Sequence, residues 1–263
     1  MSGRCGLRLA YAANPQKFRE IHCRSRLSGE QSGTEGRQVV IIFQDRCQAG
    51  RALAEIVRDE LAEELRAQDA IVLGLPRGGV PVAFEVARRL RLPLDVFVVR
   101  KLGVPGEEEL AMGAIASGGL VVLQSDVIAA WHIRQETIDA VVARERLEIE
   151  RRETAYRDGR PPAALPGRTV ILVDDGLATG ATMKAAARAL RPVARRVVVV
   201  VPVAARSTCE ELRHEADQVI CIETPEPFHA VGEFYHNFDQ TSDAEVRALL
   251  AQARGGSLDP RAA

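Results

Sequence analysis

The chain has 263 residues, of which 27% are charged and 46% hydrophobic, and its formal net charge is −1. This composition is ordinary for a globular protein, and the balanced charge argues against a dedicated nucleic-acid or membrane-surface binder, whose surface would be basic. Aromatic residues make up only 4% of the chain, which disfavours a large β-sandwich and suits helices alternating with buried parallel strands.

The cysteines and the hydropathy pattern indicate a protein of a reducing compartment. The five cysteines include no Cys-x-x-Cys pair, so a zinc site and a disulfide framework are both poorly supported. No apolar run reaches the length of about 18 residues that a membrane span requires, and early basic residues interrupt any signal-peptide core. We therefore expect a cytoplasmic protein without a membrane segment.

The first 38 residues differ in composition from the rest of the chain. Residues 1–38 are rich in Gly, Ser and Gln, and seven Lys or Arg against three Glu give them a net charge of +4. This favours a disordered basic extension, and the alternative is a basic tail that contacts an acidic partner. We expect one patterned domain over residues 39–254 and a disordered tail over residues 255–263.

The patterned region alternates between strands and helices. Short apolar runs bounded by turn residues predict buried strands over residues 70–76, 94–101, 169–175, 195–205 and 219–223. Helical spacing predicts helices after an N-cap at Asp45 and over residues 80–91, 134–157, 181–191, 207–215 and 243–254. Residues 102–111 form a predicted Gly/Pro/Glu loop, and residues 111–116 and 120–124 a predicted hairpin. Such alternation predicts a parallel sheet that binds ligands beyond the carboxyl ends of its strands.

The strongest functional signal is the stretch VILVDDGLATGAT over residues 170–182. Asp174 and Asp175 follow a buried strand, where adjacent carboxylates are costly unless they meet cations or hydroxyl donors. The next loop ends at a helix N-terminus, whose backbone N–H groups join the hydroxyls of Thr179 and Thr182 to form an anion cradle. The pattern therefore predicts a ligand in which a phosphate is joined to a diol-bearing sugar.

This stretch resembles the phosphoribosyl-pyrophosphate (PRPP) signature of the type I phosphoribosyltransferases. The resemblance implies an α/β fold of three layers, with a central parallel β-sheet flanked by helices, plus a small hood. It assigns the ribose hydroxyls to Asp174 and Asp175, which would also hold Mg²⁺ indirectly, through those hydroxyls and water. It assigns the 5′-phosphate to the loop residues Ala178, Thr179, Gly180, Ala181 and Thr182, and it also counts Gly176 among the residues that bind PRPP. The alternative is an ordinary strand–turn–helix with an N-capping threonine.

Two further segments gain weight from this resemblance. Residues 74–81 match the position of the family's pyrophosphate loop, often built on a non-prolyl cis peptide, and Arg77, Gly78 and Gly79 would bind the diphosphate. Residues 99–114 resemble the family's mobile catalytic loop, where Arg100 and Lys101 would neutralise pyrophosphate charge. The alternative for the second segment is a solvated loop with basic ends.

The acceptor is less well defined by the sequence. Residues 225–240 lie where the family builds its hood, so Phe228, Phe234 and Tyr235 could stack on an acceptor ring or could instead seal the sheet edge. The 6-oxopurine members carry an acid where this chain has Ala178. The nearest substitutes by location are three consecutive acids of the mobile loop, Glu107, Glu108 and Glu109, and Glu109 is the one we assign.

Together these features predict a Mg²⁺-dependent phosphoribosyltransferase that moves the 5-phosphoribosyl group of PRPP to a nucleobase-like acceptor and releases pyrophosphate. The expected catalytic residues are Asp174, Asp175, Lys101 and Glu109. We expect a homodimer with small-molecule ligands and no nucleic-acid or membrane partner. The alternative is a non-catalytic PRPP-binding regulatory protein, although no DNA-binding helix-turn-helix is apparent.

Overall fold

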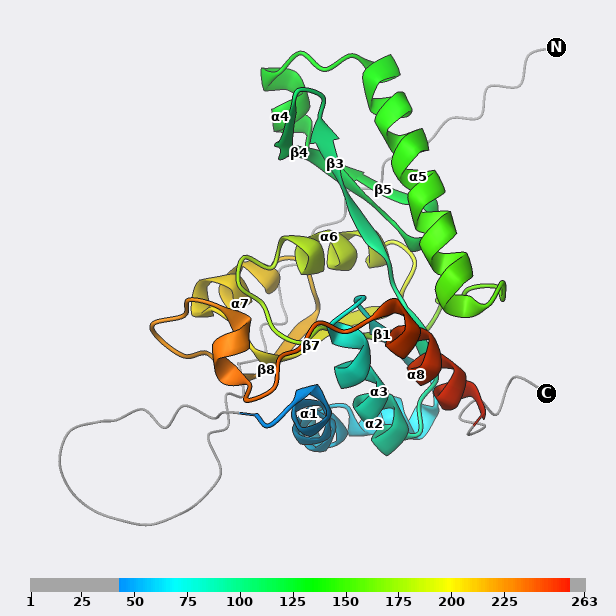
Figure 1. Cartoon of the computed structure of the whole chain (residues 1–263), viewed down its shortest axis with the longest axis vertical. Coiled ribbons are helices and arrows are strands. Elements are labelled where there is room, and N and C mark those ends of the chain that lie inside the picture. The colour runs from blue at the N-terminus through cyan, green and yellow to red at the C-terminus, as the bar shows by residue number, and fades with distance from the viewer. Residues whose placement is uncertain (1–42, 256–263) are drawn as a thin grey trace.

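The computed structural model describes residues 43–255, so the expectations for residues 1–38 and for the tail after Gly255 lie outside the described residues. Two parts are evident in Figure 1: a body built around a five-stranded sheet, and a smaller lobe that rises from it. The three-layer α/β fold with a parallel sheet is confirmed. None of the helices within residues 43–255 is both long and apolar enough to cross a membrane.

The sheet of the body is parallel throughout, and its order is β2-β1-β6-β7-β8. Its strands are β1 (Ala70–Gly74), β2 (Leu94–Val96), β6 (Thr169–Val173), β7 (Arg196–Val203) and β8 (Gln218–Glu223). Every residue of β1 and β6 is buried, as expected for strands covered on both faces. The chain winds outward in opposite directions from β1 and β6, so the switch point, where such sheets bind ligands, lies between them.

Helices cover both faces of this sheet. One face packs against α1 (Arg46–Glu60), α3 (Gly79–Leu90) and α8 (Asp243–Gly255), and α2 (Ala62–Ala67) follows α1. The other face packs against α6 (Ala181–Leu190) and α7 (Arg206–Leu212). Alternate strand residues serve the two cores: Val72 and Ile171 face the first set, and Ile71 and Leu172 face the second.

Most of the predicted helices and strands are present. The N-cap at Asp45 is confirmed, because its side chain accepts a hydrogen bond from the Gln48 N–H at 2.7 Å. The predicted helices over residues 134–157, 181–191, 207–215 and 243–254 are found within a few residues of their expected bounds. The helix predicted after Asp45 is divided into α1 and α2, and the short helix α4 (Ser125–Ala130) was not predicted, since it buries no side chain that would give a clear apolar period.

The smaller lobe required two corrections. The single strand predicted over residues 94–101 is two strands, because β2 joins the body sheet while β3 (Val99–Val104) begins the antiparallel sheet of the lobe. The loop predicted over residues 102–111 is mostly strand, since β3 turns at Pro105 and Gly106 into β4 (Glu107–Ala116). The first residues of β4 are exposed acids that have no apolar alternation, so the sequence pattern resembled a loop.

The lobe is completed by β5 (Leu120–Leu123), which forms the predicted hairpin with β4, and by the long helix α5 (Gln135–Arg157). Residues 225–240, where we expected the hood, lie in the body, beside the start of α1 and Asp175. They include a 3₁₀ turn, Val231–Phe234, and pack beside the start of α1 through two backbone hydrogen bonds of Phe43, to Phe234 and His236, each of 2.8 Å.

A buried ion pair fixes the end of α5 to the body sheet. The guanidinium of Arg157 lies 2.9 Å from Asp95 Oδ1 and donates to the carbonyl of Val96, also at 2.9 Å. Both charged residues are buried, with relative exposures of 4% and 8%. Removing one partner of such a pair leaves an uncompensated buried charge, which costs far more than the pair itself contributes.

We predict that Asp95→Ala lowers the free energy of unfolding by about 3 kcal/mol, because Arg157 would stay buried with only Glu153, at 2.8 Å, as its counter-charge. The matched control is Glu211→Ala, which breaks the exposed pair with Lys184 and should cost about 1 kcal/mol or less. Chemical denaturation of both variants measures the difference. Similar small losses in both variants would contradict the structural role of the Asp95–Arg157 pair.

Candidate active site

Two loops meet at the switch point, at the carboxyl ends of β1 and β6. The N–H of Leu75 donates to the carbonyl of Val173 at 2.9 Å, which joins the start of one loop to the end of the other strand. A Cβ atom on Gly78 would lie 2.1 Å from Asp175 Oδ2, and one on Gly79 would lie 2.7 Å from the Val173 carbonyl oxygen. A side chain at Gly79 would collide with backbone atoms, and one at Gly78 would displace the Asp175 carboxylate, so the close approach of the loops favours the sequence Gly-Gly.

The backbone of the β1 loop has the form that the resemblance implied. The peptide bond between Pro76 and Arg77 is cis, although Arg77 is not a proline. The side chain of Arg77 is 39% exposed and lies 3.9 Å from Asp243 Oδ1. The loop over residues 75–79 therefore lies directly against the two acids that follow β6, and it carries the guanidinium of Arg77.

The two acids occupy different environments. Burial, with the neighbouring charge of Asp175 as the next cause, raises the pKa of Asp174 well above its usual range. Its Oδ1 accepts a hydrogen bond from the Asp175 N–H at 2.9 Å. This arrangement stabilises the protonated form of Asp174 in the absence of a cation or hydroxyl donor, and it favours binding of such a group.

Arg46 was not identified from the sequence, yet it contacts Asp175. Its Nε lies 2.8 Å from Asp175 Oδ2, and the two side chains are only 12% and 14% exposed. Arg46 also donates to the carbonyl of Asp239 at 2.7 Å and lies 4.0 Å from the ring centroid of Phe238. In sequence Arg46 looks like an ordinary first residue of a helix, 129 positions from its partner, so no local signal indicated it.

The loop over residues 176–182 is anchored by hydrogen bonds to β7 and α7, and most of its side chains are exposed to solvent. Leu177 donates to the carbonyl of Val203 and accepts from the N–H of Ala205, each at 3.0 Å, so the loop is fixed to the end of β7. The hydroxyl of Thr208 donates to the Ala178 carbonyl, a support that the sequence did not reveal. Four of the predicted cradle residues are exposed: Ala178, Thr179, Ala181 and Thr182.

Gly180 forms the turn into α6. Its φ is +63°, and a Cβ there would meet the side chain of Thr208 at 2.5 Å. Glycine is therefore required by both conformation and space. The exposed loop residues consequently lie at the N-terminal end of a ten-residue helix, where a helix favours an anion.

The predicted residues of the mobile segment lie in the smaller lobe. Arg100 pairs with Glu145 of α5 at 2.9 Å, and Lys101 pairs with Glu109 at 3.0 Å across the β3–β4 hairpin. The Glu109 side chain is fully exposed. The structure thus brings Lys101 and Glu109 together within the hairpin, and Arg100 contacts α5. The body, by contrast, brings Arg77, Gly78 and Gly79 together with the two acids.

The aromatic residues of the segment over residues 225–240 lie beside the acids but are largely packed. Phe234 and Tyr235 are buried, and the Tyr235 hydroxyl donates to the Asp175 carbonyl at 2.5 Å. Phe228 is partly exposed and stacks on Phe234 with ring centroids 5.3 Å apart. This placement agrees with the alternative that the rings seal the sheet edge. Acceptor contact stays a prediction, and Phe228 has the most accessible of these rings.

The described residues contain no group of three or more His, Cys, Asp and Glu side chains that could hold a metal ion on its own. The donor set offered at the switch point is the pair Asp174 and Asp175. Two carboxylates suit a hard cation that shares its remaining ligands with water and a bound sugar phosphate.

Comparison with known proteins agrees with this geometry. The family model described as the phosphoribosyl transferase domain matches residues 43–239, which include both loops and the two acids. The chain belongs to the phosphoribosyltransferase family.

Relatives of the chain are found among curated proteins and solved structures. Two proteins of Mycobacterium tuberculosis, from strains CDC 1551 and H37Rv, are both named "Putative phosphoribosyl transferase". Each is 47% identical over 227 residues, which cover 84% of this chain and 50% of the relative. The chain therefore spans about half the length of these curated relatives. The crystal structure of TT1426 from Thermus thermophilus is 45% identical with a TM-score of 0.71, and the match covers 81% of this chain and 99% of that one.

We predict that Asp174→Asn stabilises the ligand-free protein. Because the folded-state pKa of Asp174 is raised, its ionisation destabilises the fold as the pH rises through the unfolded-state value towards the folded-state value. The substitution should add about 0.5–2 kcal/mol to the free energy of unfolding near pH 8, and less near pH 5. The asparagine oxygen can still accept from the Asp175 N–H.

Denaturant unfolding at the two pH values measures this effect, with the exposed Asp126→Asn as the control. Asp126 lies at the start of α4, where loss of its charge should change stability little. A gain that is equal at both pH values, or no gain at all, would contradict the burial and like-charge origin of the shift.

Proposed function

We propose that the chain binds PRPP with Mg²⁺ and transfers the 5-phosphoribosyl group to a nucleobase-like acceptor, with release of pyrophosphate. One observation supports this most strongly. Asp174 and Asp175 lie against the loop over residues 75–79 on one side and lead into the exposed N-terminus of α6 on the other. The proposed diphosphate, diol and monophosphate sites thus follow one another along one edge of the sheet, which is the order of these groups in PRPP.

Each residue has a defined role in this proposal. Asp174 and Asp175 accept hydrogen bonds from the ribose hydroxyls, which lowers the cost of their burial and mutual repulsion. The N–H groups and hydroxyls over residues 178–182 hold the 5′-phosphate. Arg77, with the backbone of Gly78 and Gly79, holds the pyrophosphate. Asp174 and Asp175 would hold Mg²⁺ indirectly, through the ribose hydroxyls and water, and the ion would supply positive charge that stabilises the leaving pyrophosphate.

The chemistry would be displacement at the anomeric carbon with inversion of configuration. The bond to pyrophosphate breaks as the bond to the acceptor nitrogen forms, and positive charge develops on the sugar ring. The carboxylates of Asp174 and Asp175 lie where they can stabilise that charge, so the chain acts chiefly by positioning and electrostatics.

In the ligand-free structure, Arg46 is the ion-pair partner of Asp175. In the structure it neutralises Asp175 at 2.8 Å, so a ribose hydroxyl must share or replace this interaction. The cation–π contact with Phe238 and the bond to the Asp239 carbonyl keep the guanidinium nearby when Asp175 turns to the sugar. Roles for Lys101 and Glu109 require the β3–β4 hairpin to come over the acids, as the resemblance to a mobile loop implies.

We predict that Asp175→Asn weakens Mg-PRPP binding at least about tenfold, since a charge-assisted hydrogen bond to the sugar is lost. Asp126→Asn serves as the matched control and should bind as the wild type does. Isothermal titration calorimetry with Mg-PRPP measures both. Equal affinities of the wild type and Asp175→Asn would remove the diol role from this residue.

A non-catalytic PRPP-binding protein is the second candidate. It is favoured by Ala178, which stands exposed where an acceptor-activating acid is found in the 6-oxopurine enzymes. A pyrophosphate-release assay with Mg-PRPP and a panel of purines, pyrimidines and aromatic amides separates the two. Turnover with any acceptor supports the transferase, whereas tight PRPP binding without turnover across the panel supports the regulatory protein.

A further inference from the structure

A polar cleft borders the β1 loop on the side opposite to Asp174 and Asp175. It has a volume of about 450 Å³, and its walls come from three separated segments: the loop at Pro76 and Arg77, the end of α5, and the first turns of α8. Across the sheet, β1 lies between β2 and β6. The loop over residues 75–79 therefore separates this cleft from Asp174 and Asp175.

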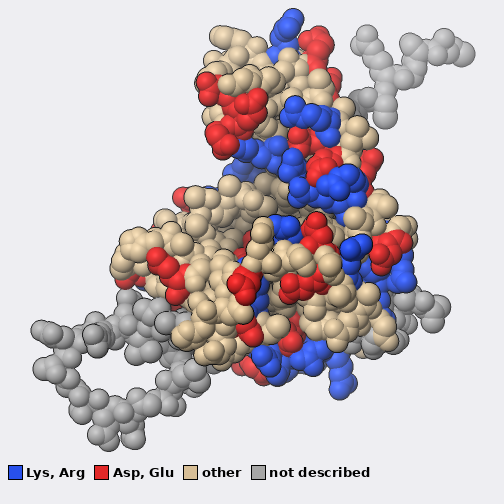
Figure 2. All heavy atoms as spheres, viewed as in Figure 1, with Lys and Arg blue, Asp and Glu red and all other residues tan. Residues whose placement is uncertain are grey.

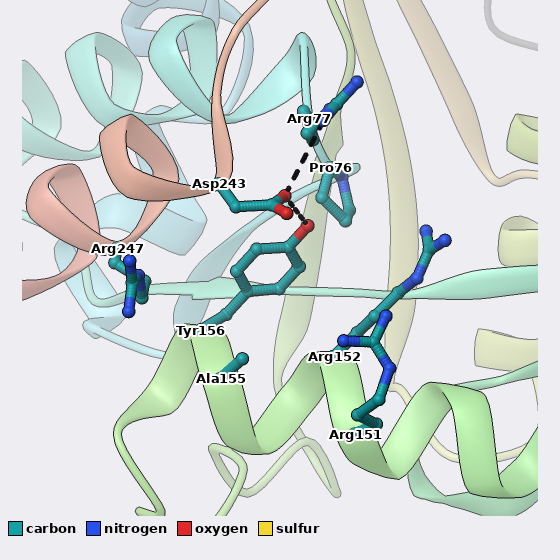
Figure 3. A pocket seen from close by; sticks show the side chains of 8 residues that line it. All are labelled: Pro76, Arg77, Arg151, Arg152, Ala155, Tyr156, Asp243 and Arg247. Carbon is teal, nitrogen blue, oxygen red and sulfur yellow. Dashed lines mark hydrogen bonds and ion pairs between the residues drawn. The ribbon is translucent and has the colours of Figure 1, made fainter.

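Four arginines line the cleft: Arg77, Arg151, Arg152 and Arg247. Figure 3 shows Arg151 and Arg152 on one side of Tyr156 and Arg247 on the other. In Figure 2, basic side chains gather where α5 meets the body, with acidic side chains among them. Guanidinium groups that line one cleft repel one another, and an anion bound in the cleft would offset that repulsion.

The acids near the cleft do not balance these four charges. Glu148 binds both Arg151 and Arg152, with donor–acceptor distances of 2.7–2.9 Å, and these hydrogen bonds lower its pKa to about 2. Asp243 is the one acid that lines the cleft. Among the described residues, Arg247 forms no ion pair, so two carboxylates face four guanidinium groups.

Asp243 makes a close hydrogen bond with Tyr156 and only a distant ion pair with Arg77. Its Oδ1 accepts a hydrogen bond from the Tyr156 hydroxyl at 2.7 Å, whereas Arg77 lies 3.9 Å away (Figure 3). Burial, followed by this hydrogen bond, raises the pKa of Tyr156 to about 12, so the hydroxyl keeps its proton and donates. The long, exposed contact between Arg77 and Asp243 contributes little, so a better anion can take Arg77 from it.

We propose that this arginine cleft is a binding site for a small anion that carries two or more phosphate groups. Planar guanidinium groups bind phosphate oxygens in a bidentate manner, and four of them around a space of this size suit a polyphosphate better than a single carboxylate. Arg151, Arg152 and Arg247 lie outside every motif assigned to PRPP. The site therefore adds a second ligand beside the proposed pyrophosphate loop, with Arg77 shared between the two.

The probe is inorganic tripolyphosphate, titrated calorimetrically into the full chain at low ionic strength without a divalent metal. The wild type should bind it, and Arg247→Gln and Arg151→Gln should each weaken binding about tenfold, through loss of a charge-assisted contact. Asp243→Asn should tighten binding several-fold, because the competing charge is removed while an oxygen remains for the Tyr156 hydroxyl. The control Arg213→Gln removes one exposed charge at the end of α7 and should leave the affinity unchanged.

The outcomes also separate this site from the proposed transferase site. Asp175→Asn should bind tripolyphosphate as well as the wild type does, because Asp175 does not line the cleft. No binding by the wild type, or binding that is insensitive to Arg247→Gln, overturns the proposal. Binding of tripolyphosphate that depends on Arg247, in a chain that fails to bind Mg-PRPP, would support the cleft and refute the proposed function.

Discussion

The site depends on one constraint: two carboxylates are held at the end of a buried strand, with a glycine loop pressed against them. Asp174 carries the cost of this arrangement as a raised pKa, and Gly78 and Gly79 permit it because any Cβ would collide with the acids or their backbone. Strands β1 and β6 pair in register, from Ala70–Thr169 to Gly74–Val173. The two strands therefore end at the same level, and the two loops begin side by side. The fold thus places two acidic groups, Asp174 with its raised pKa and Asp175 paired with Arg46, where a ligand can reach them.

Neighbouring elements hold Asp175 in place. Arg46 and the Tyr235 hydroxyl both contact Asp175, one at the carboxylate and one at the carbonyl. On the opposite side of the glycine loop, the guanidinium groups of the arginine cleft exceed the carboxylates near them. The edge of the sheet therefore presents an acidic centre flanked by basic surfaces, which suits ligands that combine hydroxyls with several phosphates.

Local patterns were sufficient to predict the elements that form the site. The apolar run before Asp174, the glycines after Leu75 and the helix after Gly180 are contiguous signals, and the structure has each where the sequence indicated. Contacts between distant segments were not predictable, because nothing local distinguishes Arg46 or Thr208 from ordinary helix residues. The β3–β4 hairpin was mistaken for a loop because β4 begins with three consecutive exposed acids, Glu107 to Glu109, which show no apolar alternation.

The most direct test of the proposed site is a crystal structure of the chain with Mg-PRPP bound. We predict the ribose hydroxyls on Asp174 and Asp175, the 5′-phosphate at the N–H groups over residues 178–182, and the pyrophosphate on the loop over residues 75–79. Arg46 should have moved away from Asp175 Oδ2 or share it with the sugar. PRPP bound elsewhere, with the Arg46–Asp175 pair and both loops unaltered, would contradict the proposed site.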